Sequence, residues 1–233
     1  MAWPWLWSQR WTDLLFQHWP VEVTKLRPLV PERLDIEQYE GTAWVAVTPF
    51  RISRMGFRGA PIPPFAISEL NVRTYVTDGR RSGVWFLSLD AASRFFVMAG
   101  RGMYRLPYVF AGIRTRREGS RIRYEATRPD GTAFTATYGP SGIAFRPAPG
   151  SFDHWCVERY CLYAGAGPRL WRAEIAHAPW ELSPATVAIE RNDMLSVHGL
   201  AASGPAAPPR YASPLDVVIG PPVSLRLFPT GAP

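Results

Sequence analysis

The sequence predicts a mainly β (α+β) fold, in which antiparallel strands dominate and a few short helices accompany them. The first observation is a clear hairpin, because residues 121–128 and 132–138 alternate apolar and polar side chains around the turn Pro129-Asp130-Gly131. The second is that 233 residues with 47% hydrophobic content can bury a full core, while no shift in composition and no internal repeat marks a boundary. We therefore expect one domain over 1–233, built mainly from antiparallel sheet.

The N-terminal part is expected to hold an arm, short strands and one short helix. Four tryptophans make residues 1–12 a Trp-rich arm, which we expect to pack against the domain. Apolar residues at helical spacing after Pro20 predict a helix that Pro31 ends. Glycine and proline residues predict a long loop over 53–66. The other predicted elements here are strands at 14–19, 34–37 and 42–50, with the helix at 21–29.

The rest of the chain is predicted to begin with a second hairpin, in which strands 69–76 and 84–89 flank a turn at 78–82. Asp90 is the expected N-cap of the helix that follows. The remaining predicted elements are that helix at 91–100, strands at 109–114, 161–164, 170–177 and 215–219, a helical turn at 152–160 and a flexible loop at 201–214.

The strand 69–76 carries two chemically different rows of side chains. Glu69, Asn71, Arg73 and Tyr75 fall on one face, because successive residues of a strand point to opposite sides. The other face carries Leu70, Val72, Thr74 and Val76. A carboxylate, an amide, a guanidinium and a phenol at two-residue spacing are typical of the wall of a polar pocket. The alternative is a solvated face with a Glu-Arg pair.

Charge and hydropathy limit the classes of partner. The net charge is +7, but the densest basic stretch, 114–117, lies at the end of a predicted strand and no nucleic-acid-binding motif accompanies it. We therefore expect no nucleic-acid partner. No apolar run approaches the roughly 20 residues needed to cross a bilayer, and the N-terminus lacks the pattern of a signal peptide. We expect a cytoplasmic protein with no membrane partner.

Few side chains are suited to covalent or metal chemistry. Lys25 is the only lysine among 26 basic residues, so an amine nucleophile could come only from Lys25 or the N-terminus. Cys156 and Cys161 have no histidine at ligand spacing, which makes a zinc site improbable. The sequence predicts no metal and no cofactor.

Short motifs follow one another in a specific order along nearly the whole chain. They are Phe16-Gln17-His18-Trp19-Pro20-Val21, Leu26-Arg27-Pro28-Leu29-Val30-Pro31-Glu32-Arg33-Leu34, Gly41-Thr42-Ala43-Trp44-Val45, Pro49-Phe50, Glu69 to Val76, Phe86-Leu87-Ser88-Leu89-Asp90-Ala91, Leu106-Pro107-Tyr108 and Glu158-Arg159-Tyr160. Together they resemble the YqjF-like family of uncharacterised bacterial proteins. That family in turn looks like a distant branch of the acetoacetate decarboxylase-like superfamily, which implies a β-barrel enclosing a small-molecule pocket.

One departure from the superfamily pattern affects the expected chemistry. In the decarboxylases, the segment that resembles Gly100 to Tyr108 ends in Pro-Lys-Lys, and the first lysine forms a Schiff base with the keto acid. The two lysine positions are Tyr108 and Val109 in this chain. A phenol cannot form an imine with a ketone, so the resemblance implies a retained pocket without decarboxylation by that mechanism.

The resemblance leaves an enzyme hypothesis open. The protein would act on a small carbonyl or carboxylate compound by proton transfer, without a covalent intermediate. Glu69 would be the general base or acid, with its pKa raised by burial, and Tyr108 would donate a hydrogen bond to a developing oxyanion. Arg73 and Arg101 would hold an anionic group, and Asn71 would orient the substrate.

Two hypotheses without catalysis stay open beside it. In one, the same barrel binds or senses an anionic or aromatic small molecule, with Arg73 for specificity and an apolar body. That body would come from Trp44, Trp85, Phe86 and Tyr104. In the other, a buried hydrogen-bonded network specifies the fold and binds nothing, and its members are Glu69, Asn71, Arg73 and Glu158-Arg159-Tyr160. The sequence does not decide whether the protein is an enzyme, and a homo-oligomer is compatible with it.

Overall fold

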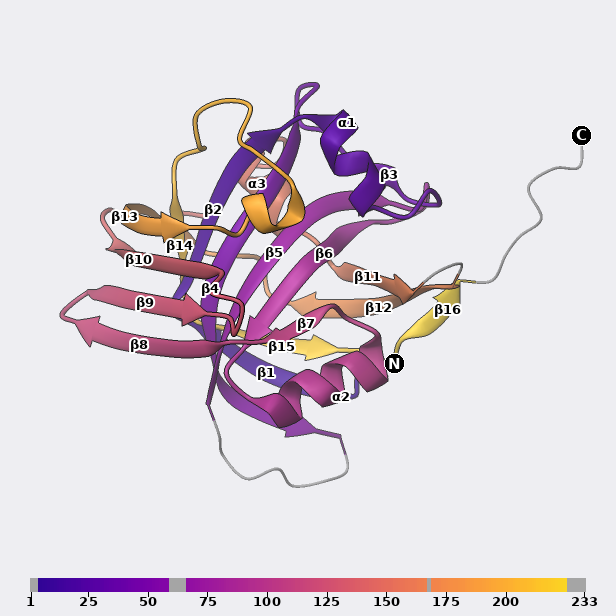
Figure 1. Cartoon of the computed structure of the whole chain (residues 1–233), viewed down its shortest axis with the longest axis horizontal. Coiled ribbons are helices and arrows are strands. Elements are labelled where there is room, and N and C mark those ends of the chain that lie inside the picture. The colour runs from indigo at the N-terminus through magenta and orange to yellow at the C-terminus, as the bar shows by residue number, and fades with distance from the viewer. Residues whose placement is uncertain (1–3, 59–65, 167–168, 226–233) are drawn as a thin grey trace, which may run out of the picture.

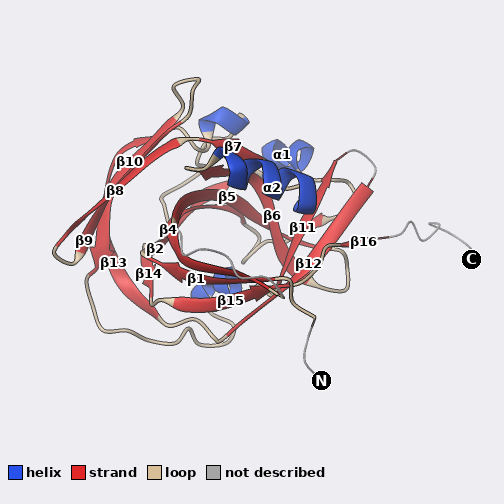
Figure 2. Ribbon diagram, turned by 90° about the horizontal axis from the view of Figure 1, so that it is seen from below, coloured by secondary structure: helices blue, strands red, loops and turns tan. Residues whose placement is uncertain are grey.

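The computed structural model describes residues 4–58, 66–166 and 169–225. Within these ranges sixteen strands belong to one sheet, and seven of them close into a ring. Six neighbouring pairs around the ring are antiparallel, and β6 pairs with β11 in parallel. Figure 2 shows these strands encircling one space. In order, they are β5 (Ile67–Thr77), β6 (Ser82–Ala91), β11 (Cys161–Ala166), β12 (Arg169–His177), β15 (Leu215–Ile219), β1 (Trp7–Thr12) and β4 (Ala43–Phe57), which pairs again with β5.

An antiparallel extension of the sheet continues from β4 and lies beside the ring (Figure 2). Its order is β2 (Leu14–Val21), β14 (Arg210–Ala212), β13 (Leu182–Asn192), β10 (Ala133–Pro140), β9 (Arg121–Thr127) and β8 (Gly112–Glu118). Short strands pair at the margins: β3 (Asp35–Ile36), β7 (Tyr108–Phe110) and β16 (Val223–Leu225). The helical segments are α1 (Val23–Leu26), η1 (Arg27–Leu29), α2 (Arg94–Tyr104), α3 (Phe152–Val157) and η2 (Ser196–His198). No helix of the described residues is long and apolar enough to cross a membrane.

The two rows of β5 face two different cores. Leu70, Val72 and Val76 belong to a core between the ring and the extension, together with Tyr124 and Phe134. The opposite row faces the inside of the ring, where the other core contains Tyr75, Phe86 and Leu89. Strict alternation on a strand that is covered on both faces produces this division. The prediction of a two-faced strand in a hairpin with 84–89 is therefore confirmed.

Helix α2 lies across one end of the ring (Figure 1) and buries Val97 and Tyr104. Its N-cap is Ser93, whose Oγ accepts a hydrogen bond from the backbone N–H of Phe96 at 3.3 Å. The prediction that Asp90 caps this helix is wrong. Asp90 lies at the end of β6 and forms a bidentate ion pair with the buried Arg128 of the extension. Because Asp90 is buried on a strand, its carboxylate needs a charged partner, and Arg128 supplies it.

Removing the cap is expected to weaken α2 without disturbing the barrel. Ser93→Ala leaves the first-turn N–H groups without the side-chain acceptor, which costs about 1 kcal/mol. Urea unfolding measures the loss. Ser93→Asp, which keeps an acceptor and adds a favourable charge at the helix start, is the matched variant and should retain wild-type stability. Equal stability of Ser93→Ala and wild type would show that the cap is dispensable.

Several boundaries differ from those expected from sequence. Residues 7–12, expected as part of an arm, form β1 and complete the ring between β4 and β15. Residues 53–57, expected as loop, belong to β4, because pairing with β1 holds them extended despite Gly56. Residues 210–212 of the expected flexible loop pair as β14 with β2 and β13. Residues 1–3 and 59–65 lie outside the described residues.

Candidate functional site

The inward row of β5 lines a small cavity inside the ring, which we call the inner chamber. Glu69, Asn71 and Arg73 line it from β5, and Phe86 and Leu89 line it from β6. Glu69, Asn71 and Arg73 are 3%, 6% and 8% exposed, respectively. The cavity measures about 70 Å³. The register of the hairpin shifts between Val72 and Arg73. This irregularity lets Phe86 and Leu89, three residues apart on β6, both face inward.

Glu69 and Tyr108 form the acid pair of the chamber. The Tyr108 hydroxyl, at the start of β7, donates a hydrogen bond to Glu69 Oε2 at 3.0 Å. The pKa of Glu69 is raised to about 8, chiefly by burial and also by the nearby Asp90 charge, against the lowering effect of hydrogen bonds from Tyr108 and Asn71. Burial beside Glu69 also raises the pKa of Tyr108 well above its usual value. Both groups are therefore predominantly protonated at neutral pH.

Arg73 differs from the other buried arginines because its charge has no counter-ion. Among the described residues, its guanidinium makes no hydrogen bond or ion pair, and the buried Nε has no partner. Its contacts are with aromatic faces, with the guanidinium carbon 5.2 Å from the ring centroid of Phe16 and 6.0 Å from that of Tyr75. Asn71 Oδ1 is also buried without a donor. The chamber thus presents an unpaired positive charge and a free acceptor.

The chamber is also lined by three polar side chains that were not predicted from the sequence to lie there. Arg159 follows α3, where its charge is paired with Glu37 and its Nε donates to the Trp155 carbonyl. His177 ends β12, and burial lowers its pKa. Gln9 comes from β1. Each belongs to a strand or turn remote from β5 in the sequence, so only closure of the ring brings them together. The Glu158-Arg159-Tyr160 motif was the sole sequence signal.

Not every predicted site residue reaches the chamber. Arg101 lies on α2, is exposed, and donates through Nε to the Tyr108 carbonyl at 2.7 Å, so it holds the start of β7 and lines neither cavity. Trp44 packs on Phe152 of α3, with ring centroids 4.6 Å apart, and also lines neither cavity. Trp85 donates its indole N–H to the Leu29 carbonyl and packs against the core outside the ring. Tyr75 hydrogen-bonds to His18.

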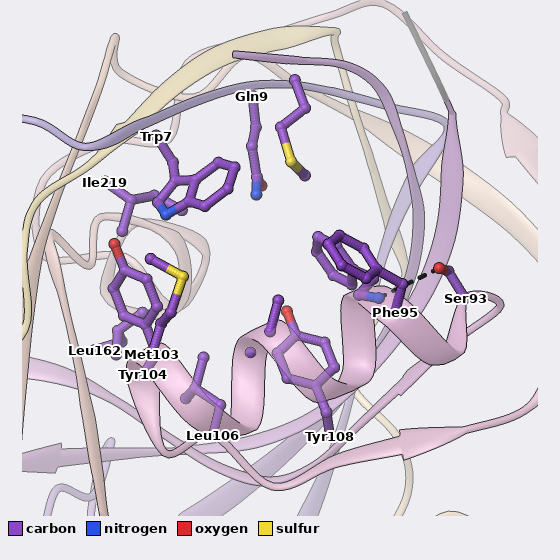
Figure 3. A pocket seen from close by; sticks show the side chains of 14 residues that line it. Trp7, Gln9, Ser93, Phe95, Met103, Tyr104, Leu106, Tyr108, Leu162 and Ile219 are labelled. Atoms are coloured by element: carbon purple, nitrogen blue, oxygen red, sulfur yellow. Dashed lines mark hydrogen bonds between the residues drawn. The ribbon is translucent and has the colours of Figure 1, made fainter. Parts of the chain in front are cut away.

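A second, larger cavity lies between α2 and the end of the ring (Figure 3). This outer cavity measures about 310 Å³. Met103 and Tyr104 line it from α2, and Trp7 lines it from β1. Its residues shared with the inner chamber are Gln9, Leu106, Tyr108, Leu162 and Ile219. Tyr104, a predicted ligand residue, therefore faces the outer cavity, where its hydroxyl donates to the Gly220 carbonyl at 2.9 Å.

Gly100 permits the close packing of α2 on Tyr108. A Cβ at this position would lie 2.4 Å from two ring carbons of Tyr108, whereas a Cβ at Gly102 on the same helix would meet nothing within 4 Å. Gly100→Ala is therefore expected to displace the Tyr108 ring, disturb its bond to Glu69 and destabilise the protein by about 1–3 kcal/mol. Gly102→Ala, the matched control, should stabilise it by about 0.5–1 kcal/mol through helix propensity. Thermal unfolding of both variants measures the difference, and equal effects would contradict this account of Gly100.

Comparison with known proteins identifies the family. The model of the DUF2071 family, described as an uncharacterized conserved protein, matches residues 8–216. The chain belongs to the DUF2071 family. One similar protein is the uncharacterized protein YqjF of Bacillus subtilis (strain 168). It is 38% identical over 223 residues, which cover 93% of this chain and 91% of YqjF. The resemblance inferred from the motifs is therefore confirmed at the level of the family.

Solved structures show which superfamily shares the fold of this DUF2071 protein. The enduracididine biosynthesis enzyme MppR, in complex with pyruvate, has a TM-score of 0.70 at 11% identity, with 96% of this chain and 91% of MppR covered. Acetoacetate decarboxylase from Legionella pneumophila has a TM-score of 0.67 at 10% identity, with coverage of 97% and 89%. The fold is thus that of the acetoacetate decarboxylase-like proteins. No lysine lines either cavity, and Lys25 is exposed on α1.

Proposed function

We propose that this protein binds a small carboxylate compound in the inner chamber, with the carboxylate on Arg73. The observation that carries the proposal is the buried guanidinium without a counter-ion. An unpaired buried charge is costly, because it loses its hydration and gains no partner in return. A ligand carboxylate would offset that cost by forming charge-assisted hydrogen bonds in a forked geometry. Arg159 is less suited to this role, since Glu37 already pairs with it.

The size and the remaining polar groups of the chamber limit which chemical classes of ligand head group can bind there. A cavity of about 70 Å³ has room for on the order of five heavy atoms, since one water needs about 10–15 Å³ in the same measure. Protonated Glu69 would donate to a ligand carbonyl oxygen, and Asn71 Oδ1 would accept from a ligand hydroxyl or N–H group. A 2-oxo acid head group satisfies the size, the charge and the donor. The complex of the similarly folded MppR with pyruvate supports this class.

Calorimetric titration with pyruvate and methyl pyruvate tests the proposal. The two compounds have the same carbonyl, but the ester lacks the negative charge that Arg73 would hold. We expect pyruvate to bind and the ester to bind at least tenfold more weakly, because charge-assisted hydrogen bonds contribute about 1.5–3 kcal/mol. Equal affinity for the two would overturn the proposal. Treatment with pyruvate and borohydride should leave the protein mass unchanged, and a stable adduct would contradict the loss of imine chemistry.

Proton transfer is the second candidate function, and the Glu69-Tyr108 pair favours it. A carboxyl whose pKa is about 8 is close to the value that general acid-base catalysis at physiological pH needs. The deprotonated fraction of Glu69 would remove a proton from the carbon beside the ligand carbonyl and later return one from the exchanged carboxyl, so the compound is unchanged apart from isotope exchange. Proton NMR of pyruvate in D₂O measures loss of the methyl signal. Wild type should accelerate exchange and Glu69→Gln should not, while retaining pyruvate binding. Exchange at the same rate in both would remove this function.

A further inference from the structure

The outer cavity provides apolar contact and few free polar groups. Its lining is dominated by side chains such as Met55, Phe96 and Leu106. Three of its hydroxyl groups are engaged elsewhere: Ser93 caps α2, the Tyr104 hydroxyl donates to Gly220, and the Tyr108 hydroxyl donates to Glu69. The side-chain oxygen of Gln9 accepts from the indole N–H of Trp11 at 2.7 Å. Among the described residues that line this cavity none is charged, so it suits a hydrocarbon group better than a second charged one.

The outer cavity and the inner chamber share part of their lining. Leu106, Leu162 and Ile219 border both, and so does the ring of Tyr108. Figure 3 shows the Tyr108 side chain rising from the strand beside α2 toward the middle of the outer cavity. Its hydroxyl is the end that contacts Glu69 in the chamber. A ligand whose head lies on Arg73 would leave the chamber between these side chains and enter the apolar space.

We propose that the ligand is an amphipathic carboxylate whose apolar tail occupies the outer cavity. This inference rests on the proposed function, because that function places the carboxylate on Arg73. The inner chamber of about 70 Å³ takes only the head group, whereas the outer cavity of about 310 Å³ reaches the lower end of the usual size of small-molecule sites. Met103 and Phe95 at its rim are 39% and 79% exposed. A bound tail would remove part of this apolar surface from water.

A series of straight-chain 2-oxo acids, from pyruvate to 2-oxooctanoate, tests the proposal on the wild-type protein. Burial of one methylene contributes about 0.8 kcal/mol, which is about a fourfold gain in affinity for each added carbon. We expect the dissociation constant measured by calorimetry to fall by about this factor with each carbon beyond the first few. An affinity that does not change with chain length, while pyruvate itself binds, would overturn the tail site and leave the carboxylate site standing. Absence of binding by every member would instead remove the proposed function.

Substitutions in α2 test whether the apolar tail of the ligand lies in the outer cavity. Ala99 lines the outer cavity and no part of the chamber, so Ala99→Phe should leave the affinity for pyruvate unchanged and abolish the gain for 2-oxooctanoate. Met98→Phe is the matched control, because Met98 is 68% exposed and lines neither cavity. Met103→Trp, at the exposed rim, fills the same space if Ala99→Phe does not fold. Retention of the chain-length gain in a folded variant of either kind would contradict the assignment of the tail to the outer cavity. Equal binding of 2-oxooctanoate and its methyl ester would instead contradict the carboxylate site of the proposed function.

Discussion

Arg73→Met is expected to abolish carboxylate binding and, at the same time, to stabilise the ligand-free protein. Truncating one partner of a buried charge pair costs about 2–5 kcal/mol of binding, so affinity for pyruvate should fall by about 30-fold or more. In the absence of ligand the same change removes a buried charge that has no counter-ion. Methionine keeps an apolar side chain against Phe16 and Tyr75. We expect a stability gain of about 1–3 kcal/mol.

Calorimetry and urea unfolding measure these two opposite effects on the same variant. Arg54→Met is the matched control, because the Arg54 side chain is 69% exposed and pairs with Asp216 away from the chamber. It should change both quantities by less than about 1 kcal/mol. A large loss of stability in Arg73→Met would instead support the hypothesis of a structural network that binds nothing. A gain in stability would fit a ligand site, because functional residues commonly reduce the stability of the ligand-free protein.

Glu69 is expected to make the stability of the protein decrease as pH rises from about 4.5 to 8. The folded protein holds the Glu69 proton up to a pKa of about 8, whereas the ordinary pKa of a free glutamate side chain is 4.5. Between these values the native state binds more protons than the unfolded state, so the free energy of unfolding falls with increasing pH. The contribution of Glu69 is highest below about pH 4.5 and levels off above 8. Since a tenfold difference in acidity corresponds to about 1.4 kcal/mol, the total loss amounts to several kcal/mol.

Glu69→Gln isolates this contribution from those of other buried groups. Glutamine stays neutral and keeps an acceptor for the Tyr108 hydroxyl, so it imitates the protonated acid. Urea unfolding at pH 5, 6.5 and 8.5 should show similar stability of variant and wild type at the lowest pH. The variant should be more stable by several kcal/mol at the highest. A difference that does not vary with pH would show that Glu69 does not change its charge in this window.

The hypotheses that the sequence left open can be distinguished by whether each buried polar group has a hydrogen-bond partner or a counter-ion. Glu69 and Tyr108 do satisfy each other, as a structural network requires. The Arg73 guanidinium has no counter-ion and Asn71 Oδ1 has no donor, and both residues border a cavity. A network kept only for packing is expected to be internally satisfied. The open partners therefore favour a ligand, whereas catalysis depends on the pH behaviour of Glu69.

Local patterns predicted the strands of the site but not the boundaries around it. The hairpins at 69–89 and 121–138 were predictable because alternation and turn residues are contained within a few residues. The strand β13 was missed, since it contains Pro184 and is exposed or half-buried along most of its length, so its apolar pattern is weak. Strand β1 was missed as a ring strand because its pairing partners, β4 and β15, are remote in sequence.

The sequence by itself determined that Glu69, Asn71 and Arg73 share one face of a strand, since the two-residue period of β-structure requires it. The resemblance to the decarboxylases, together with the chemistry of a phenol, implies that Tyr108 stands at the Schiff-base position and cannot act as that lysine does. Only the tertiary structure decided that this face is enclosed, that Arg73 has no counter-ion and that Arg101 points elsewhere. Burial, pairing and cavities depend on residues brought together by closure of the ring. Their separation along the chain leaves no local pattern from which to predict them.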